Sequence, residues 1–335
     1  MKWSIIGCGN ISNKFCDDLL HVKNAKISAI ASNNIKRLKI FGDKYKIHEK
    51  SMFQGYEEIL DTEFDIAYIG LINSLHKNIV KTFATKGKNI LIEKPCFLSL
   101  KDFNECEELI KKNKILFVES MMNLHHPQSN LIFNLIKNEE IGDIFGFEHN
   151  FGFDIRQKIL LIFKKKIDFL NRLTDPLLGG GAINDLGCYG VAFSNKISKL
   201  LNKGPVSSLK KKNIIGPTGV DINSTIEINY SNNFKSTIKV CFDEKLGCSA
   251  RILGSKGEIF IPNLVTPERK FKIILKKSSL KEYQEESKGL YSYVASDVQR
   301  YLEKKIQEPD NYGLKLKEIK QNLKILDEWK SYEDI

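Results

Sequence analysis

The chain has 335 residues, of which 42% are hydrophobic and 28% charged, so it can bury two cores and is neither disordered nor fibrous. Its net charge of +11 would suit a polyanionic partner. However, the lysines are scattered, and the basic runs at residues 164–166 and 210–212 lack interleaved aromatic residues. We therefore expect solvated loops at these runs and no nucleic-acid binding.

The cysteines and histidines point to neither a disulfide framework nor a metal site. The seven cysteines include no CxxC pair, and the six histidines show no HxxxH or HxH spacing, which predicts reduced, packed thiols and no bound metal. The chain enters a short strand directly after Met1, and its apolar runs are too short to span a bilayer. This pattern favours a cytoplasmic protein with no membrane partner.

The first third alternates short apolar strands with amphipathic helices, which is typical of βαβ units and a parallel sheet. The strands are expected at residues 3–6, 26–31, 65–70, 89–93 and 115–118, and the helices at 12–21, 35–44, 56–60, 76–85 and 99–112. From about residue 144 the segments alternate in polarity, which favours an antiparallel or mixed sheet. These later strands are expected at residues 144–153, 225–230, 236–242, 249–253 and 258–261, with helices at 180–200, 291–304 and 313–329.

A glycine-rich loop joins the first strand to the first helix. It reads Gly7-Cys8-Gly9-Asn10-Ile11-Ser12, with Ser where the third glycine of GxGxxG would stand. Gly7 permits the tight turn, while Gly9, Asn10 and Ile11 bring backbone N–H groups and the helix N-terminus towards a pyrophosphate. The loop therefore predicts dinucleotide binding, and the alternative is an ordinary glycine-rich turn.

The second strand ends without the carboxylate that NAD-specific sites place there to bind the ribose 2′-hydroxyl. Ser32 and Asn33 stand at this point and can donate hydrogen bonds, and Lys36 or Arg37 can supply positive charge. A 2′-phosphate would be attracted there, so the sequence favours NADP over NAD. The alternative is that the two cations lie on a solvent-facing helical turn.

Two further segments carry candidate catalytic groups. Glu93-Lys94-Pro95 follows a buried strand, where Lys94 could bind a substrate oxygen and stabilise alkoxide character during hydride transfer. Asp185 and Tyr189 are four residues apart after a run of three glycines, hence on one helical face. Tyr189 could exchange a hydroxyl proton while Asp185 orients it, but an Asp favoured by the helix dipole and a packed Tyr would give the same pattern.

Together these segments resemble the Gfo/Idh/MocA oxidoreductase family, and within it the dihydrodiol dehydrogenase and sugar dehydrogenase branch. The resemblance covers nearly the whole chain, and the order of the motifs matters more than any one of them. The matching stretches are GCGNIS, residues 73–76, residues 93–95, residues 126–128, the segment from Asn171 to Tyr189 and the turn at residues 254–257.

The resemblance implies an α/β protein with an N-terminal Rossmann domain (residues 1–120) and a C-terminal α+β domain (residues 121–335). The second domain would bind substrate and form subunit contacts through an open, mostly antiparallel sheet, giving a homodimer or homotetramer, and the C-terminal helix would pack back on the first domain. The cofactor would be NADP, or NAD.

The resemblance also assigns roles to residues. Lys94 matches the catalytic lysine, Tyr189 the proton-transferring tyrosine of this branch, and Asp185 the active-site aspartate. The positions of Asn73 and His76 lie near the nicotinamide and ribose, and Glu93, like Lys94, contacts the cofactor side. For His76 the alternative is a residue that caps its own helical turn.

One departure limits the assignment of a substrate. Where the branch has an aromatic-Arg pair, this chain has Asn123-Leu124 followed by His125. We expect hydride transfer between NADP(H) and a sugar, sugar derivative or cyclic diol. The alternatives are an enzyme acting on a nucleotide-linked sugar, which the positive charge would attract, and a non-catalytic NADP(H)-binding sensor or scaffold.

Overall fold

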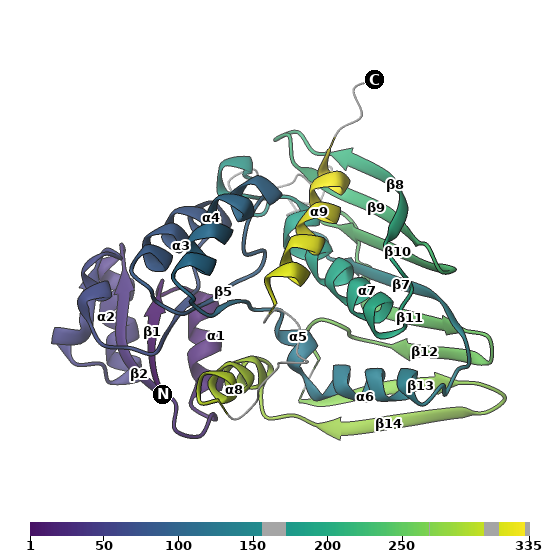
Figure 1. The fold of residues 1–335 in the computed structure, drawn as a ribbon, viewed down its shortest axis with the longest axis horizontal. Coiled ribbons are helices and arrows are strands. Elements are labelled where there is room, and N and C mark those ends of the chain that lie inside the picture. The colour runs from purple at the N-terminus through teal and green to yellow at the C-terminus, as the bar shows by residue number, and fades with distance from the viewer. Residues whose placement is uncertain (156–171, 268, 305–314, 332–335) are drawn as a thin grey trace, which may run out of the picture. The chain divides into compact units, whose positions relative to one another are not determined.

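The structure is a computed structural model that describes residues 1–155, 172–267, 269–304 and 315–331. Two compact units form, the first from Met1–His125 and Lys288–Lys320 and the second from His126–Ser287 and Gln321–Ile335. Each unit contains one sheet with its own helices (Figure 1). The lysines at 164–166 and the motif residue Asn171 lie outside the described residues.

The first unit contains a six-stranded sheet in the order β3-β2-β1-β4-β5-β6, with every neighbouring pair parallel. The strands are β1 (Lys2–Ile6), β2 (Lys26–Ser32), β3 (Met52–Gln54), β4 (Ile66–Ile69), β5 (Ile90–Ile92) and β6 (Phe117–Glu119). The alternating pattern had predicted a parallel sheet, and this prediction is confirmed. The short strand β3 was not predicted, because its three residues carry no apolar run.

Helices cover both faces of this sheet. Helices α3 and α4 pack together on one face, while α1 packs with α8 on the other (Figure 1). The helices are α1 (Asn10–Leu19), α2 (Ile35–Tyr45), α3 (His76–Thr85), α4 (Leu100–Lys112), α5 (Met122–His125) and α8 (Leu290–Leu302). The helix expected at residues 56–60 is only a 3₁₀ turn, Glu58–Asp61.

The second unit contains an eight-stranded sheet in the order β14-β13-β12-β11-β7-β10-β9-β8. Among the described strands of this sheet, only β7 and β10 pair in parallel, so the sheet is mostly antiparallel, as expected. The strands are β7 (Ile144–Gly152), β8 (Val206–Ile215), β9 (Asp221–Tyr230), β10 (Phe234–Cys241), β11 (Gly247–Gly254), β12 (Gly257–Ile261), β13 (Lys270–Lys276) and β14 (Leu280–Glu286).

Helices α6 (Pro127–Lys137) and α7 (Cys188–Leu200) lie along one face of the second sheet (Figure 1). The single helix expected at residues 180–200 is divided, because a π-helical turn at Ile183–Gly187 precedes α7. A Cβ on Gly187 would lie 2.8 Å from the Trp329 ring, so helix α9 (Leu316–Lys330) approaches this turn closely. The division between the two units falls within α9.

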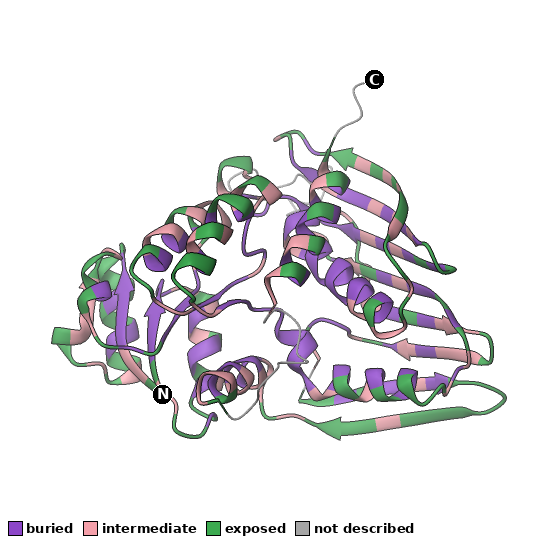
Figure 2. Cartoon of the chain, viewed as in Figure 1, coloured by how far each residue is buried: buried purple, intermediate pink, exposed green. Residues whose placement is uncertain are grey.

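The two faces of the second sheet differ sharply in composition. Buried residues such as Ile238 and Ile252 alternate along the strands with partly or fully exposed ones (Figure 2), and a Cβ on Gly190 of α7 would lie 2.8 Å from Ile238. On the exposed face, Arg251 of β11 pairs with Glu148 of β7 and with Glu258 of β12. The basic run at residues 210–212, expected in a loop, lies within strand β8; that expectation was wrong because an edge strand with exposed faces lacks an apolar pattern.

Six of the seven cysteines are buried, and Cys248 is half-buried. This burial agrees with their positions inside apolar runs. Among the described residues, no helix combines the length and the apolar character needed to span a membrane.

Candidate active site

The carboxyl ends of the parallel strands bring the predicted cofactor residues to one edge of the first sheet. Gly7 follows β1, Ser32 ends β2, and Lys94 comes two residues after β5. The strand order reverses between β1 and β4, since the chain continues outward from β1 through β2 and β3 and then returns to β4. Open α/β sheets bind ligands outside such a reversal point.

Gly7 occupies a position that only glycine fits. Its φ is +96°, and a Cβ there would lie 2.7 Å from Leu71 Cδ2 and 2.8 Å from the carbonyl oxygen of Gly70. Residues other than glycine rarely adopt such a φ. Gly7 therefore allows the chain to turn tightly from β1 into the first helix, while its N–H donates to the carbonyl of Ala31 at 2.8 Å.

Gly9 serves a different purpose, because its φ is −95° and nothing lies within 4 Å of a Cβ built on it. The space in front of α1 is therefore open at this residue. Asn10 and Ile11 begin α1, for which the described contacts include no side-chain cap. Uncapped N–H groups beside an open space fit the pyrophosphate of a dinucleotide.

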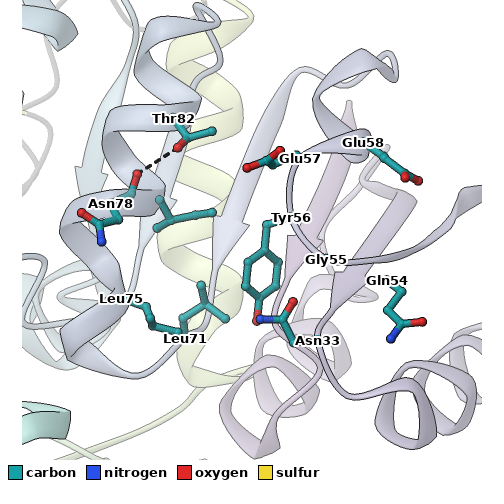
Figure 3. A pocket seen from close by; sticks show the side chains of 11 residues that line it. Asn33, Gln54, Gly55, Tyr56, Glu57, Glu58, Leu71, Leu75, Asn78 and Thr82 are labelled. Atoms are coloured by element: carbon teal, nitrogen blue, oxygen red, sulfur yellow. Dashed lines mark hydrogen bonds between the residues drawn. The ribbon is translucent and has the colours of Figure 1, made fainter.

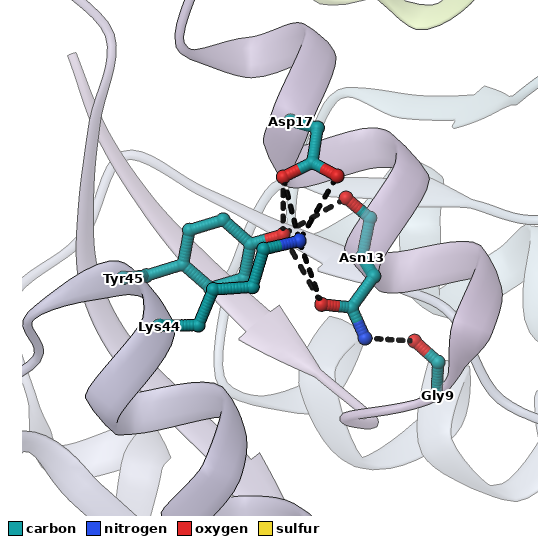
Figure 4. Close-up of polar contacts among 5 residues, drawn as sticks. All are labelled: Gly9, Asn13, Asp17, Lys44 and Tyr45. Atoms are coloured by element: carbon teal, nitrogen blue, oxygen red, sulfur yellow. Dashed lines mark hydrogen bonds and ion pairs between the residues drawn. The ribbon is translucent and has the colours of Figure 1, made fainter.

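A polar cluster fixes α1, the helix that follows the glycine loop, against α2 (Figure 4). The Asn13 amide donates to the Gly9 carbonyl at 3.2 Å. From α2, the Tyr45 hydroxyl donates to Asp17 Oδ1 at 2.8 Å, and Lys44 Nζ lies 2.8 Å from the same oxygen. The cluster holds α1 against α2.

The loop after β2 is ordered by its own side chains. Ser32 is buried, and its Oγ accepts a hydrogen bond from the Asn34 N–H at 3.2 Å. Asn34 then caps α2, because its Oδ1 accepts from the Arg37 N–H at 3.0 Å. Asn33 and the Arg37 side chain are exposed. The sequence had not distinguished the capping role of Asn34 from that of its neighbours.

A cavity of about 490 Å³ opens beside this loop (Figure 3). Its walls come from the loops after β2, β3 and β4 and from α3. Tyr56 extends into it towards Asn33 (Figure 3), whose backbone N–H donates to the Tyr56 hydroxyl. The lining residues are Asn33, Gln54, Gly55, Tyr56, Glu57, Glu58, Leu71, Leu75, Asn78, Ile79 and Thr82. An aromatic ring and apolar side chains beside the strand reversal suit an adenine ring, although Tyr56 was not among the predicted site residues.

Lys94 lies in a turn that is held from two sides. The Lys94–Pro95 peptide bond is cis, and Lys94 is half-buried while its neighbours on both sides are buried. Glu119 Oε1, at the end of β6, accepts from the Cys96 N–H at 2.9 Å. The turn therefore presents Lys94 from a rigid base.

His76 supports the same turn from within. Its Nδ1 lies 2.9 Å from the carbonyl oxygen of Pro95 and its Nε2 3.2 Å from that of Leu71. Burial lowers the pKa of His76 to about 4, so the ring is neutral and donates to one carbonyl at a time. The alternative that His76 caps its own helix is wrong, since its ring contacts other loops. Asn73 starts the 3₁₀ turn just before it and is half-buried.

Glu93 is only 5% exposed. Its Oε1 accepts a hydrogen bond from the Tyr68 hydroxyl at 2.8 Å, and the Tyr291 hydroxyl is a further donor to this carboxylate. Neither tyrosine was predicted, because they come from β4 and α8, far from Glu93 in the sequence. Their contacts give Glu93 partners inside the protein.

In the second unit, Asp185 lies in the π-helical turn and Tyr189 in the first turn of α7. Asp185 Oδ1 is 3.6 Å from Arg172 Nη1, and Tyr189 is buried, with its ring 6.3 Å from that of Phe151. Asp221, which was not predicted, accepts from the Ile183 N–H at 2.7 Å and so caps this turn. The structure thus brings Asp185 and Tyr189 onto one short segment.

The segment that departs from the expected branch forms α5. Asn123 and His125 are both buried there. His125 Nδ1 lies 2.8 Å from Asp297 Oδ2 of α8, so the C-terminal part of the chain contributes to this position. No local pattern indicates this pair, because its members are far apart along the chain.

Comparison with known proteins agrees with this fold. Residues 1–120 match the oxidoreductase family with an NAD-binding Rossmann fold, GFO/IDH/MocA, and residues 131–260 match the GFO/IDH/MocA C-terminal domain. The chain belongs to this family. It is an NAD(P)-dependent oxidoreductase, as the glycine loop and the resemblance predicted.

Its curated relatives include the trans-1,2-dihydrobenzene-1,2-diol dehydrogenases. The Xenopus tropicalis enzyme is 29% identical over 265 residues, which are 78% of this chain and 75% of the relative. The Homo sapiens enzyme is 24% identical over 266 residues, covering 78% and 75%.

Solved structures share the fold over almost the full length. An aldose-aldose oxidoreductase from Caulobacter crescentus, complexed with glycerol, has a TM-score of 0.82 and 17% identity, with 98% of this chain and 96% of that chain covered. A 3-ketoreductase from Actinomadura kijaniata, in complex with NADP and TDP-benzene, has a TM-score of 0.81, 17% identity and the same coverage.

Proposed function

We propose that this oxidoreductase transfers hydride between NADP(H) and a CH–OH group of a sugar, sugar derivative or cyclic diol. The observation that carries the proposal is the half-exposed Lys94, presented by a rigid turn at the same sheet edge as the open glycine loop. The names of the relatives support the substrate class, since they act on a dihydrodiol, an aldose or a keto group.

In this proposal Lys94 and Tyr189 have different roles at the substrate oxygen. When bound, the cofactor supplies or accepts the hydride at the substrate carbon. In the reducing direction, Lys94 hydrogen-bonds the carbonyl oxygen and Tyr189 delivers the proton that completes the hydroxyl group, so the products are an alcohol and the oxidised cofactor. In the oxidising direction the same proton returns to Tyr189. Asp185 would orient the substrate or Tyr189.

The proposed cofactor site includes Gly7, Gly9, Asn10, Ile11 and the loop after β2. The uncapped α1 and the open space at Gly9 fit a pyrophosphate, and the cavity at Tyr56 fits the adenine. We propose a preference for NADP because Ser32 and Asn33 carry no charge and Arg37 lies in the first turn of α2. Glu57 and Glu58 also line the cavity, so the preference depends on Arg37 outweighing two carboxylates.

The first experiment is a fluorescence titration of the full chain with NADPH and, separately, with NADH. We expect tighter binding of NADPH. Arg37→Ala should weaken NADPH binding about tenfold and leave NADH binding unchanged, whereas Lys39→Ala, an exposed cation of the same helix, should change neither. Equal loss for both cofactors in Arg37→Ala would show that Arg37 does not read the 2′-phosphate.

Turnover is tested next, by following NADPH absorbance with a panel of aldoses, ketoses and cyclic diols. Cofactor oxidation or reduction with one of these classes supports the proposal. Tight NADPH binding with no turnover of any class would instead support the sensor or scaffold alternative.

The organisation of the whole protein is also a proposal. We propose a cofactor domain at residues 1–120 and a substrate domain at residues 121–335, with the protein acting in the cytoplasm as a homodimer or homotetramer. Light scattering of the purified chain measures the subunit number, and a mass equal to one chain would contradict this assembly.

A further inference from the structure

Glu93 is a buried carboxylate between two tyrosines, next to the residue proposed to handle the substrate oxygen. The Tyr68 hydroxyl donates to Glu93 Oε1 at 2.8 Å, and Tyr291 donates to the same carboxylate. Tyr68 is fully buried and Tyr291 is 4% exposed. Two neutral donors inside a protein favour the ionised form of a carboxyl group.

The two tyrosines are fixed by packing rather than by the carboxylate alone. The Tyr68 ring stacks on the Phe15 ring of α1, with ring centroids 3.7 Å apart. The Tyr291 ring contacts the same Phe15 ring edge-on, with ring centroids 5.9 Å apart. Asp18 Oδ2 accepts from the Tyr291 N–H at 2.7 Å, which ties the start of α8 to α1. The donors are therefore held in place before any ligand binds.

The charges around Lys94 come from several elements. Glu93 at the end of β5 and Glu119 at the end of β6 both interact with the Lys94 charge. His76 of α3 faces the same turn and is neutral, since burial lowers its pKa to about 4. Cys16 and Asp18 of α1 lie on the side of the tyrosines, and the pKa of the Cys16 thiol is raised well above its usual range by burial.

Burial raises the pKa of Glu93, and four groups oppose that rise: the Tyr68 hydroxyl, the Lys94 charge, the Tyr291 hydroxyl and the Lys94 N–H, which donates to Glu93 Oε2 at 3.3 Å. Without the two hydroxyls, burial would raise the pKa of Glu93 further. Glu93 would then take up a proton at a higher pH and would cease to act as a negative partner for Lys94.

We propose that Tyr68 and Tyr291 are positioning residues that keep Glu93 charged, so that Glu93 in turn remains a negative partner for Lys94 at the substrate oxygen. The inference rests on the proposed function for its catalytic consequence. The electrostatic part concerns this chain alone and can be measured without turnover.

The catalytic test is the pH profile of kcat/KM in the reducing direction for the unmodified chain, Tyr68→Phe, Tyr291→Phe and the double variant. Activity that needs the ionised form of Glu93 is lost as the pH falls, so the acidic limb should move to higher pH, by about one unit in the double variant. Tyr301→Phe, in the same helix α8, is the matched control and should leave the profile unchanged. A change in KM at every pH without a moved limb would overturn the inference.

The second test measures the free energy of unfolding in urea against pH, with and without Glu93→Gln. A carboxyl group whose pKa is raised on folding loses stability relative to glutamine as the pH rises from its unfolded pKa to its folded pKa. In the Tyr68→Phe/Tyr291→Phe background this decline should extend to higher pH. The outcome distinguishes the two proposals. If the decline in the free energy of unfolding extends to higher pH but the chain turns over no substrate, the inference is supported and the proposed function is contradicted. If the decline is unchanged, the inference is overturned even if the enzyme is active.

Discussion

The strands of the two sheets carry their polar side chains in different places. In the parallel sheet, β4 and β5 are buried along their whole length, because helices cover both faces. Polar groups such as Glu93 and Glu119 therefore occur at the strand ends. In the second sheet, β10 and β11 alternate buried and exposed residues, so charged side chains lie along the strands.

This difference determines how a charged residue should be interpreted. At the carboxyl edge of the parallel sheet, a charge is held in a nearly dry environment and must have partners, so it is a candidate for function. On the exposed face of the second sheet, Arg251 pairs with Glu148 and Glu258 while 46% of its own side chain stays exposed to solvent. Such pairs contribute little and indicate no site.

The largest expected effect is at the edge of the parallel sheet. Lys94→Ala should lower kcat/KM by a factor of about 10² to 10³, which is the range for a lost hydrogen-bond donor to a developing oxyanion, while NADPH binding stays within a few-fold. Lys101→Ala, an exposed lysine of α4, is the matched control. Steady-state kinetics with a substrate identified in the turnover screen compares the two variants. A fully active Lys94→Ala enzyme would remove Lys94 from the mechanism.

The second prediction compares adjacent residues of strand β11 that face opposite ways. Ile252 is fully buried, so Ile252→Ala should lower the free energy of unfolding by about 2–5 kcal/mol. Arg251→Ala, on the exposed face, should lower it by less than about 1 kcal/mol. Urea unfolding measures both, and equal losses would mean that the charged face is not solvated but covered.

The third prediction separates the two glycines of the first loop. Gly7→Ala should destabilise the fold by about 1–3 kcal/mol because its φ is strained for alanine and its Cβ would overlap Leu71. Gly9→Ala should leave thermal unfolding unchanged and weaken NADPH binding, since its Cβ would enter open space. If Gly9→Ala binds NADPH normally, the pyrophosphate does not approach that residue.

The fourth prediction concerns the carboxylate that caps the π-helical turn before α7. Burial raises the pKa of Asp221 from its usual 3.8 to about 6, so the folded state binds the proton more tightly than the unfolded state. The contribution of this group to stability therefore declines as the pH rises from about 4 to about 6. Asp221→Asn should lack that decline in urea unfolding measured across this range. A parallel pH dependence in both proteins would show that Asp221 titrates normally.

Features that depend on neighbouring residues in the sequence could be predicted. The Gly7–Ser12 loop and the position of Lys94 after a buried strand follow from local patterns, and the structure places both at one sheet edge. Contacts between distant segments could not be predicted. Nothing near Glu93 in the sequence indicates Tyr291 as its partner, and nothing near Ile183 indicates Asp221.

Strands β8 and β14 show the limit of apolar patterns. They were missed because they are rich in lysine or glutamate and form the two edges of the sheet. Strand β13 was also missed, although Phe271, Ile273 and Leu275 alternate there and are buried. An edge strand has fewer buried positions, so alternation of apolar residues is weak there and the backbone pairing alone makes the strand. Residues 210–212 were assigned to a loop for this reason.

The sequence by itself determined the alternation of strands and helices in the first unit, the glycine loop and the lysine at the sheet edge, because backbone preferences and burial periodicity act over a few residues. Only the tertiary structure decided which side chains surround Glu93, which carboxylate caps the segment of Asp185 and Tyr189, and which loops form the cavity at Tyr56. These depend on the packing of segments distant in the chain, where shape and desolvation select partners that local sequence does not encode.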